Sequence, residues 1–250
     1  MKGLTRQILV GISCVIMLVA NFGFGDNDFS DTTVEDTIYN NFDTAFTPTS
    51  LTFLIWFPIF LGCIAFTVYQ FLPKNRDDAG LDAIAVPIVA AFVFNALTPF
   101  FELGFSNIQV TLLLISLVFA YLTVNRHRKH ERSFYWFTQL PVSIFFAWIT
   151  VATILNMAQF LKSTGWDGFG IPPAIWSVIL ISIATVIGIF ILNQFKETAF
   201  AVVLIWAFGG IALGQLEIIP IVITVFIATL VLAGLVVQQT VMVPQQPLRH

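Results

Sequence analysis

Eight apolar segments, each close to the length that crosses a lipid bilayer, recur along the chain. A bilayer core about 30 Å thick requires about 20 apolar residues of helix. Polar breaks separate the segments, and the breaks after the third and the seventh are so short that these pairs must be antiparallel. The pattern predicts an all-α fold, a polytopic transmembrane helix bundle of about eight spans. The predicted spans are 7–24, 50–72, 84–103, 107–124, 136–161, 174–193, 197–213 and 218–237.

Composition excludes several function classes. Hydrophobic residues make up 58% of the 250 residues and charged residues only 10%, whereas soluble domains have about 25% charged residues. A net charge of −3 leaves no basic surface for nucleic acid, so no nucleic-acid partner is expected. The two cysteines, Cys14 and Cys63, both lie in apolar runs, which excludes a disulfide framework or a zinc cluster.

Basic residues orient the predicted spans, because they are retained on the cytoplasmic side. With both termini inside, only Lys162 of the eleven Lys and Arg residues falls outside. We expect an integral protein of a bacterial-type plasma membrane with both termini cytoplasmic. Lys2 and Arg6 before the first apolar run also fit a cleavable signal peptide, but the sequence around Ala20 is a poor cleavage site, which favours retention of this run as the first span. The first outer loop is acidic, with Asp26, Asp28, Asp31, Glu35, Asp36 and Asp43.

No catalytic constellation is visible in the sequence. Active sites in membranes place ionisable residues well inside the spans, whereas Glu102 and Glu217 lie only at span ends. His127 and His130 lie within a basic cluster, so we interpret that segment as a topology anchor at anionic headgroups rather than a metal site. No nucleophile-elbow, zinc-protease or phosphate-loop motif occurs. We therefore expect no enzyme activity, no metal and no required cofactor.

Three tryptophans, Trp56, Trp148 and Trp206, lie inside spans. Each indole N–H needs a hydrogen-bond acceptor that lipid cannot supply, so these side chains are expected to face the bundle. Two interpretations remain open from the residues alone, tight packing between helices and a ligand pocket.

A stripe on the fifth span combines an aromatic ring with amides. Trp148, Ala152, Asn156 and Gln159 are spaced by one and two helical turns, so they lie on one face. That face would be unfavourable against lipid, which indicates that it points into the bundle.

Depth along the helices places further polar residues beside this stripe. At 1.5 Å per residue, Asn156, Trp56 and Asn95 lie about 8, 9 and 12 Å from the outer boundary. Pro58 and Pro99 occur in the same region and each removes a backbone hydrogen bond, which can kink a span. An apolar cavity with a few amides is the expected result.

Three segments in the first five spans carry ordered motifs. They are Phe46-Thr47-Pro48 with Phe53-Leu54-Ile55-Trp56 and Phe60, Asn95-Ala96-Leu97-Thr98-Pro99-Phe100-Phe101, and Pro141 with Phe146-Ala147-Trp148 through Ala152 and Asn156. In this order they resemble the TspO/MBR family, the tryptophan-rich sensory proteins. The tryptophan of the family's third-helix signature is absent, and Phe46 stands where a tryptophan usually precedes the second helix.

The resemblance implies a five-helix bundle over residues 1–161, three additional helices over 162–237 and a short cytoplasmic tail over 238–250. It implies binding of a porphyrin or other tetrapyrrole, or of a sterol-like lipid, for sensing or transport. The implied partners are membrane lipid and this hydrophobic small molecule. Phe53, Trp56 and Trp148 would stack on it, and Asn95, Pro99 and Asn156 would complete the site.

A second function class stays open from the sequence, that of a structural or accessory subunit. Gly209, Gly210 and Gly214 create a small-residue face, and the one-turn spacing of Gly210 and Gly214 lets helices approach closely. Such a face can serve a homodimer or a larger membrane complex, or packing within the chain.

Overall fold

The computed structural model describes residues 3–23, 44–100, 103–129 and 131–242. Most of the acidic loop, Glu102, His130 and the tail from residue 243 lie outside these ranges. The described chain is all-helical, as predicted. Seven helices are long and apolar enough to span a membrane, and an eighth apolar helix is shorter.

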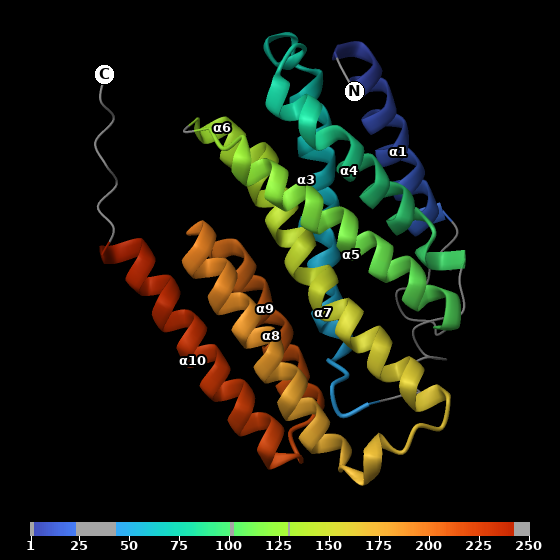
Figure 1. The fold of residues 1–250 in the computed structure, drawn as a ribbon, viewed down its shortest axis with the longest axis vertical. Coiled ribbons are helices and arrows are strands. Elements are labelled where there is room, and N and C mark those ends of the chain that lie inside the picture. The colour runs from blue at the N-terminus through green and yellow to red at the C-terminus, as the bar shows by residue number, and fades with distance from the viewer. Residues whose placement is uncertain (1–2, 24–43, 101–102, 130, 243–250) are drawn as a thin grey trace.

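Five helices form a closed ring in the N-terminal part of the chain. In Figure 1 they lie side by side, and each contacts its neighbour in the order α1, α4, α5, α7, α3 and back to α1. Short 3₁₀ turns and a π-helical turn join or precede them. The ring helices are α1 (Gly3–Gly23), α3 (Trp56–Phe71), α4 (Ala79–Ala96), α5 (Leu103–Arg126) and α7 (Leu140–Ser163), and the connecting turns are η1 (Ser50–Ile55), η2 (Pro73–Asn75), η3 (Thr98–Phe100), α6 (Arg132–Phe134) and η4 (Tyr135–Gln139).

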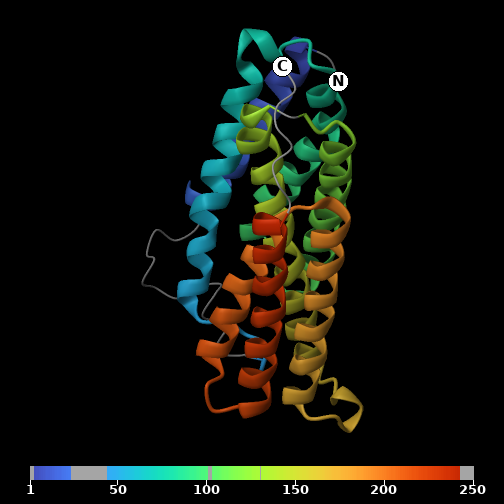
Figure 2. The same ribbon diagram turned by 90° about the vertical axis from the view of Figure 1, so that its left-hand side faces the viewer.

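Three helices pack together beside the ring. They are α8 (Pro173–Phe195), α9 (Thr198–Gly214) and α10 (Ile219–Met242), with the turn η5 (Gly168–Gly170) before them. Of the three, α9 makes most of the contact with α7, while α10 packs on α8 and α9. Figure 2 shows the three side by side. The two predicted antiparallel pairs, α4 with α5 and α9 with α10, are both in contact, which confirms them.

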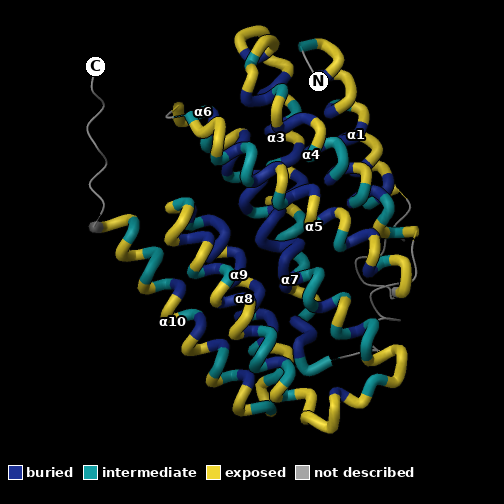
Figure 3. Tube along the Cα trace, viewed as in Figure 1, coloured by how far each residue is buried: buried dark blue, intermediate teal, exposed yellow. Residues whose placement is uncertain are grey.

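The surface of the bundle is apolar, as a lipid-facing surface must be. Large side chains such as Leu61, Phe105 and Phe226 are 67%, 68% and 64% exposed. Figure 3 shows the buried residues on the facing sides of the helices and the exposed ones on the outer sides. Burial therefore separates a packed interior from a surface suited to lipid.

Two span limits differ from the prediction for local reasons. α4 begins at Ala79 because the Asp78 carboxylate caps it, accepting from the backbone N–H groups of Gly80 and Leu81. It ends before Pro99, so the turn to α5 comes earlier than predicted. Pro58 lies in the first turn of α3, directly after the 3₁₀ helix η1.

Candidate functional site

Five aromatic rings from α3, α7 and the turn η1 meet inside the ring of helices, and we call this group the aromatic cage. Phe53 and Trp56 each approach Trp148 edge-to-face, with ring centroids 5.5 and 6.2 Å apart. Trp56 also stacks on Phe60 at 5.2 Å and meets Phe145 at 6.2 Å. These distances lie in the favourable range for aromatic pairs. Three of the six predicted site residues are thus brought together.

Burial differs across the cage. Trp148, in the middle of α7, is only 2% exposed, while Phe53 and Trp56 are half-buried. The rings contact one another, so a ligand would replace ring-to-ring contacts rather than fill a void. A cavity of about 380 Å³ lies elsewhere, in an apolar groove between α1 and α3, and none of the six predicted residues lines it.

The predicted amides lie at contacts between helices. Asn95, fully buried on α4, accepts a hydrogen bond of 3.1 Å from Asn21 of α1. Asn156 on α7 accepts one of 3.0 Å from Ser106 of α5. Both amides therefore join neighbouring ring helices, as interhelical polar pairs do in membranes.

Pro99 lies in the turn η3 after α4. The carbonyl of Phe94, near the end of α4, accepts from Gln109 Nε2 of α5 at 2.5 Å, and the same nitrogen donates to Thr98 Oγ1 at 3.2 Å. Gln109 of α5 thus bonds to the end of α4, at a carbonyl that also accepts from the Leu97 N–H.

Two buried N–H donors in this part of the ring have no partner. They are the indole Nε1 of Trp148 and the amide Nδ2 of Asn95. Two other indoles donate to carbonyls, Trp206 to Thr52 at 2.9 Å and Trp176 to Gly168 at 3.0 Å. The buried indole N–H of Trp148 differs from these two in having no acceptor among the described residues.

Helix α9 contacts residues 44–55, the segment that leads into the aromatic cage. We call these residues the lead-in segment. The Thr49 N–H donates to the Gly210 carbonyl at 3.1 Å, and Trp206 Nε1 donates to Thr52. A Cβ on Gly210 would lie 1.9 Å from Thr52 Oγ1. The missing side chain therefore lets the lead-in segment sit directly on α9, one residue before Phe53.

The same contact explains the glycine face noticed in the sequence. A Cβ on Gly214 would lie 2.9 Å from the Thr47 carbonyl oxygen. Gly210 and Gly214 thus serve a close approach within the chain, to the lead-in segment. The one-turn spacing of the two glycines indicates close packing, but the spacing alone does not identify the segment that packs against them.

The sequence did not predict the burial of two charged side chains. Arg6, read there as a topology residue, is 1% exposed; it donates to Asp82 Oδ1 and to the Asn75 carbonyl, both at 2.7 Å. Glu197, also 1% exposed, caps α9 and accepts from Gln139 Nε2 at 2.6 Å. Both residues lie next to span ends, which the sequence alone predicts to be solvated. Their burial depends on segments far away in the chain.

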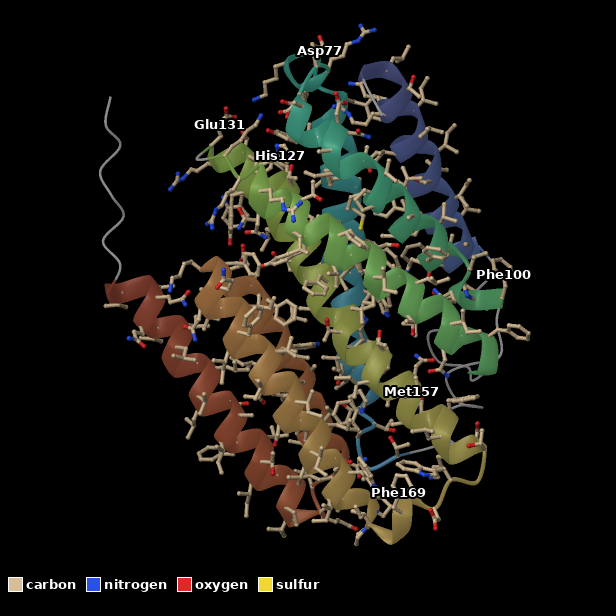
Figure 4. All side chains as sticks on the ribbon, viewed as in Figure 1. Asp77, Phe100, His127, Glu131, Met157 and Phe169 are labelled. Atoms are coloured by element: carbon tan, nitrogen blue, oxygen red, sulfur yellow. The ribbon has the colours of Figure 1, made fainter. Side chains whose placement is uncertain are left out.

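The basic residues after α5 are predicted to anchor the chain at lipid headgroups. In the structure two of them also bind other parts of the chain. Lys129 pairs with Asp78, and Arg128 donates to the Phe195 carbonyl at the end of α8 at 3.0 Å. Burial alone would raise the pKa of Asp78, but hydrogen bonds from Lys129 and from backbone N–H groups lower it. In Figure 4, Asp77, His127 and Glu131 lie toward one end of the bundle, and Phe100, Met157 and Phe169 lie toward the other.

The arrangement combines stacked and edge-on rings with buried N–H donors that have no acceptor among the described residues. Among the described residues, no group of three or more His, Cys, Asp or Glu side chains could hold a metal ion.

Comparison with known proteins gives one match. A family model described as TSPO-like protein matches residues 7–238. No curated protein and no solved structure matches the chain. The matched range starts in α1 and ends in α10, so it includes the three C-terminal helices as well as the segment that carries the sequence motifs.

Proposed function

This chain belongs to the TSPO-like protein family, and from that premise we propose that it binds a flat hydrophobic molecule inside the ring of helices. The ligand class is a porphyrin or other tetrapyrrole, or a sterol-like lipid, held for sensing or transport rather than for catalysis. The protein is an integral membrane protein with seven candidate spans, so such a ligand reaches it from the lipid phase.

The aromatic cage is the observation that carries this proposal. Phe53 and Trp56 lie far from Trp148 in the sequence, yet their ring centroids are 5.5 and 6.2 Å from that of Trp148. Flat faces of this kind stack on planar ligands as they do on each other. Because Phe53 and Trp56 are half-buried, displacing them opens the cage while Trp148 stays in place as its floor.

Polar residues of the ring complete the proposed site. Asn95 has an amide nitrogen without a partner, which makes it the amide best prepared to meet a ligand. Asn156 and Pro99 stay predictions as ligand contacts, and Asn156 accepts a hydrogen bond from Ser106 of α5.

We also propose that both termini are cytoplasmic, in a bacterial-type plasma membrane. The start of α1, the connection from α3 to α4 and the connection from α5 to α6 lie toward one end of the bundle in Figure 1. These segments hold Arg6, Lys74, Arg76 and Lys129, and basic loops remain in the cytoplasm.

The glycine face of α9 no longer supports the alternative of an accessory subunit. The Gly210 and Gly214 face is covered by the lead-in segment of the same chain, so it is not open to a partner helix. A homodimer or a larger complex stays a prediction without a structural argument of its own.

Tryptophan fluorescence in detergent tests the proposal. The purified protein is titrated with protoporphyrin IX, with its dimethyl ester and with a fluorescent sterol, and quenching or energy transfer is recorded. Saturable binding of at least one ligand at micromolar concentration is expected. Absence of saturable binding by all three would refute the proposed function. Titration of the same ligands into protein-free micelles controls for partitioning into detergent.

A further inference from the structure

Aromatic rings gather at one end of the bundle, where the end of α3 meets the turn η4. The Tyr69 ring stacks on Phe137 with centroids 5.5 Å apart, and Tyr135 meets Trp136 edge-to-face at 5.6 Å. Trp136 is 57% exposed and Phe137 is 42% exposed. Exposed rings at a span end are typical of the headgroup level of a membrane. We call the surface formed by Tyr69, Trp136 and Phe137 the end surface.

Two basic side chains border the end surface. Lys74, three residues after the end of α3, has its Nζ 5.9 Å from the centroid of the Tyr69 ring, which is within the range of a cation–π contact. Arg132 precedes Trp136 by four residues, so the two side chains lie on one side of this helical segment, and both are exposed. Figure 1 shows that the connection after α3 and the start of α6 lie toward the same end of the bundle.

Neither of these two cations forms an ion pair within the described part of the chain. The ion pairs found there join Arg6 to Asp82 and Lys129 to Asp78. Both cations of the end surface are exposed, so their positive charges can meet a group outside the chain.

One nearby carboxylate offsets part of this charge. Glu131, just before Arg132, accepts a hydrogen bond of 3.3 Å from Ser133 Oγ. Asp77 lies on the α1 side instead, because its Oδ1 is 3.7 Å from the position of a Cβ on Gly3. Two exposed cations beside one carboxylate leave the end surface with a net positive charge.

We propose that the end surface binds the headgroup of an anionic glycerophospholipid. The phosphate diester meets Lys74 and Arg132, and the first methylene groups of the acyl chains lie along Trp136 and Phe137. Basic residues near a membrane surface attract anionic lipid, and a guanidinium binds two phosphate oxygens at once. A zwitterionic lipid carries a cation of its own, so it gains less from the positive charge. This site lies outside the ring of helices and does not depend on the proposed function.

Two lipids with the same acyl chains test the selection by charge. The full chain in detergent is equilibrated with phosphatidylglycerol or with phosphatidylcholine, and native mass spectrometry records the affinity of the first bound lipid. We expect phosphatidylglycerol to bind about tenfold more tightly, which corresponds to about 1.4 kcal/mol. Equal affinity for the two lipids would overturn the proposal.

A matched pair of variants separates this site from the general charge of the bundle end. The double change Lys74→Gln and Arg132→Gln should remove the preference for phosphatidylglycerol. The control is Arg76→Gln with Arg126→Gln, which removes the same charge from exposed residues that lie over no aromatic ring among the described residues. The control should keep the preference, and an equal loss in both variants would contradict a defined site. Thermal midpoints without added lipid check that each variant is folded.

Ionic strength gives a second test that needs no variant. Raising the salt concentration from about 0.1 M to about 1 M shortens the Debye length from about 10 Å to about 3 Å. The preference of the wild-type protein for phosphatidylglycerol should therefore decrease, because both cations are exposed. A preference that is unchanged by salt would overturn the proposal.

A soluble phosphate distinguishes a lipid from a water-soluble ligand. Glycerol 3-phosphate carries the phosphate of the headgroup without acyl chains, so at millimolar concentration it should leave phosphatidylglycerol bound. Displacement of the lipid would assign the surface to a soluble phosphate instead. Porphyrin binding should be the same in the Lys74→Gln and Arg132→Gln variant as in wild type, because neither residue belongs to the aromatic cage. Failure of the lipid site is thus distinguishable from failure of the proposed function.

Discussion

The five-helix ring and the three C-terminal helices pack in lipid by different means. In the ring, polar side chains join different helices, as between Asn95 and Asn21 or between Asn156 and Ser106. In the C-terminal group, hydroxyl groups mostly bond back to their own helix, as Thr185 does to the Ile181 carbonyl. Bonds between side chains of different helices therefore occur in the ring, whereas in the described C-terminal group Gln239 of α10 donates to the Leu192 backbone carbonyl of α8 at 2.8 Å.

Close packing at small residues stabilises the C-terminal group. A Cβ on Gly188 of α8 would lie 2.6 Å from Leu204 Cδ1 of α9, and one on Gly210 would overlap Thr52. Small residues let helices approach and gain van der Waals contact. The comparison teaches that the ring should tolerate added volume better than lost polarity, and that the C-terminal group should behave in the opposite way.

The largest effect is expected from the cage floor. Trp148→Ala should cost about 3–5 kcal/mol of stability and abolish ligand binding. Phe208→Ala on α9, where the native side chain is 0% exposed, is the matched control. It should lose similar stability but keep its ligand affinity per folded molecule. Thermal unfolding and the fluorescence titration measure the two effects, and equal loss of affinity in both variants would contradict a site confined to the ring.

The next effect comes from the contact between α9 and the lead-in segment. Gly210→Ala should destabilise by about 1–3 kcal/mol, because overpacking forces the Thr52 side chain and its backbone to move. Gly209→Ala is the control on the same helix, since its Cβ would meet nothing within 4 Å. That change should be neutral or stabilising. Similar losses for both glycines, seen in thermal midpoints, would mean that volume is not what matters there.

A pH dependence is expected at Glu197, where the two regions meet. Burial raises the pKa of this carboxyl above its ordinary value, outweighing the hydrogen bonds from Ala199 N–H and Gln139 and the attraction of Arg128. The folded chain therefore keeps a proton that the unfolded chain has released, so stability falls as the pH rises from about 4.5 through the folded pKa.

One proton limits the slope to about 1.4 kcal/mol per pH unit. Glu197→Gln should remove this part of the slope, and thermal midpoints measured between pH 4 and pH 8 check it. The groups around the carboxyl include Tyr121 and Tyr135 as well as Arg128, and none of these loses its charge or proton in that range by its ordinary pKa. An unchanged slope in the variant would assign the pH dependence to another group.

The smallest effect compares two single polar groups. Asn156→Leu removes a bond between helices and should cost about 0.6–1.7 kcal/mol. Thr185→Val removes a bond within α8 and should cost less. If Asn156→Leu leaves ligand affinity per folded molecule unchanged, Asn156 is a packing residue; weaker binding would support its predicted ligand contact. A larger cost for Thr185→Val would reverse the comparison between the regions.

The sequence predicted the helices well because apolar length is a local property. The described parts of all eight segments are helical, and some of the limits shift at a cap or a proline, as at Asp78 and Pro99. Phe53, Trp56 and Trp148 were also brought together correctly, since two motifs and a helical stripe indicated them independently. Asn95 and Asn156 were expected in the same layer, but each found its partner on an adjacent helix.

By itself the sequence determined a helical membrane protein with aromatic rings in its interior, because span length, hydropathy and helical period act within one segment. The tertiary structure decided which groups are buried and what covers them. Arg6 and Glu197 are buried by chain far away in sequence, and Gly210 receives Thr52 from 158 positions earlier. Burial and close approach are properties of pairs of segments, so only the folded chain could reveal them.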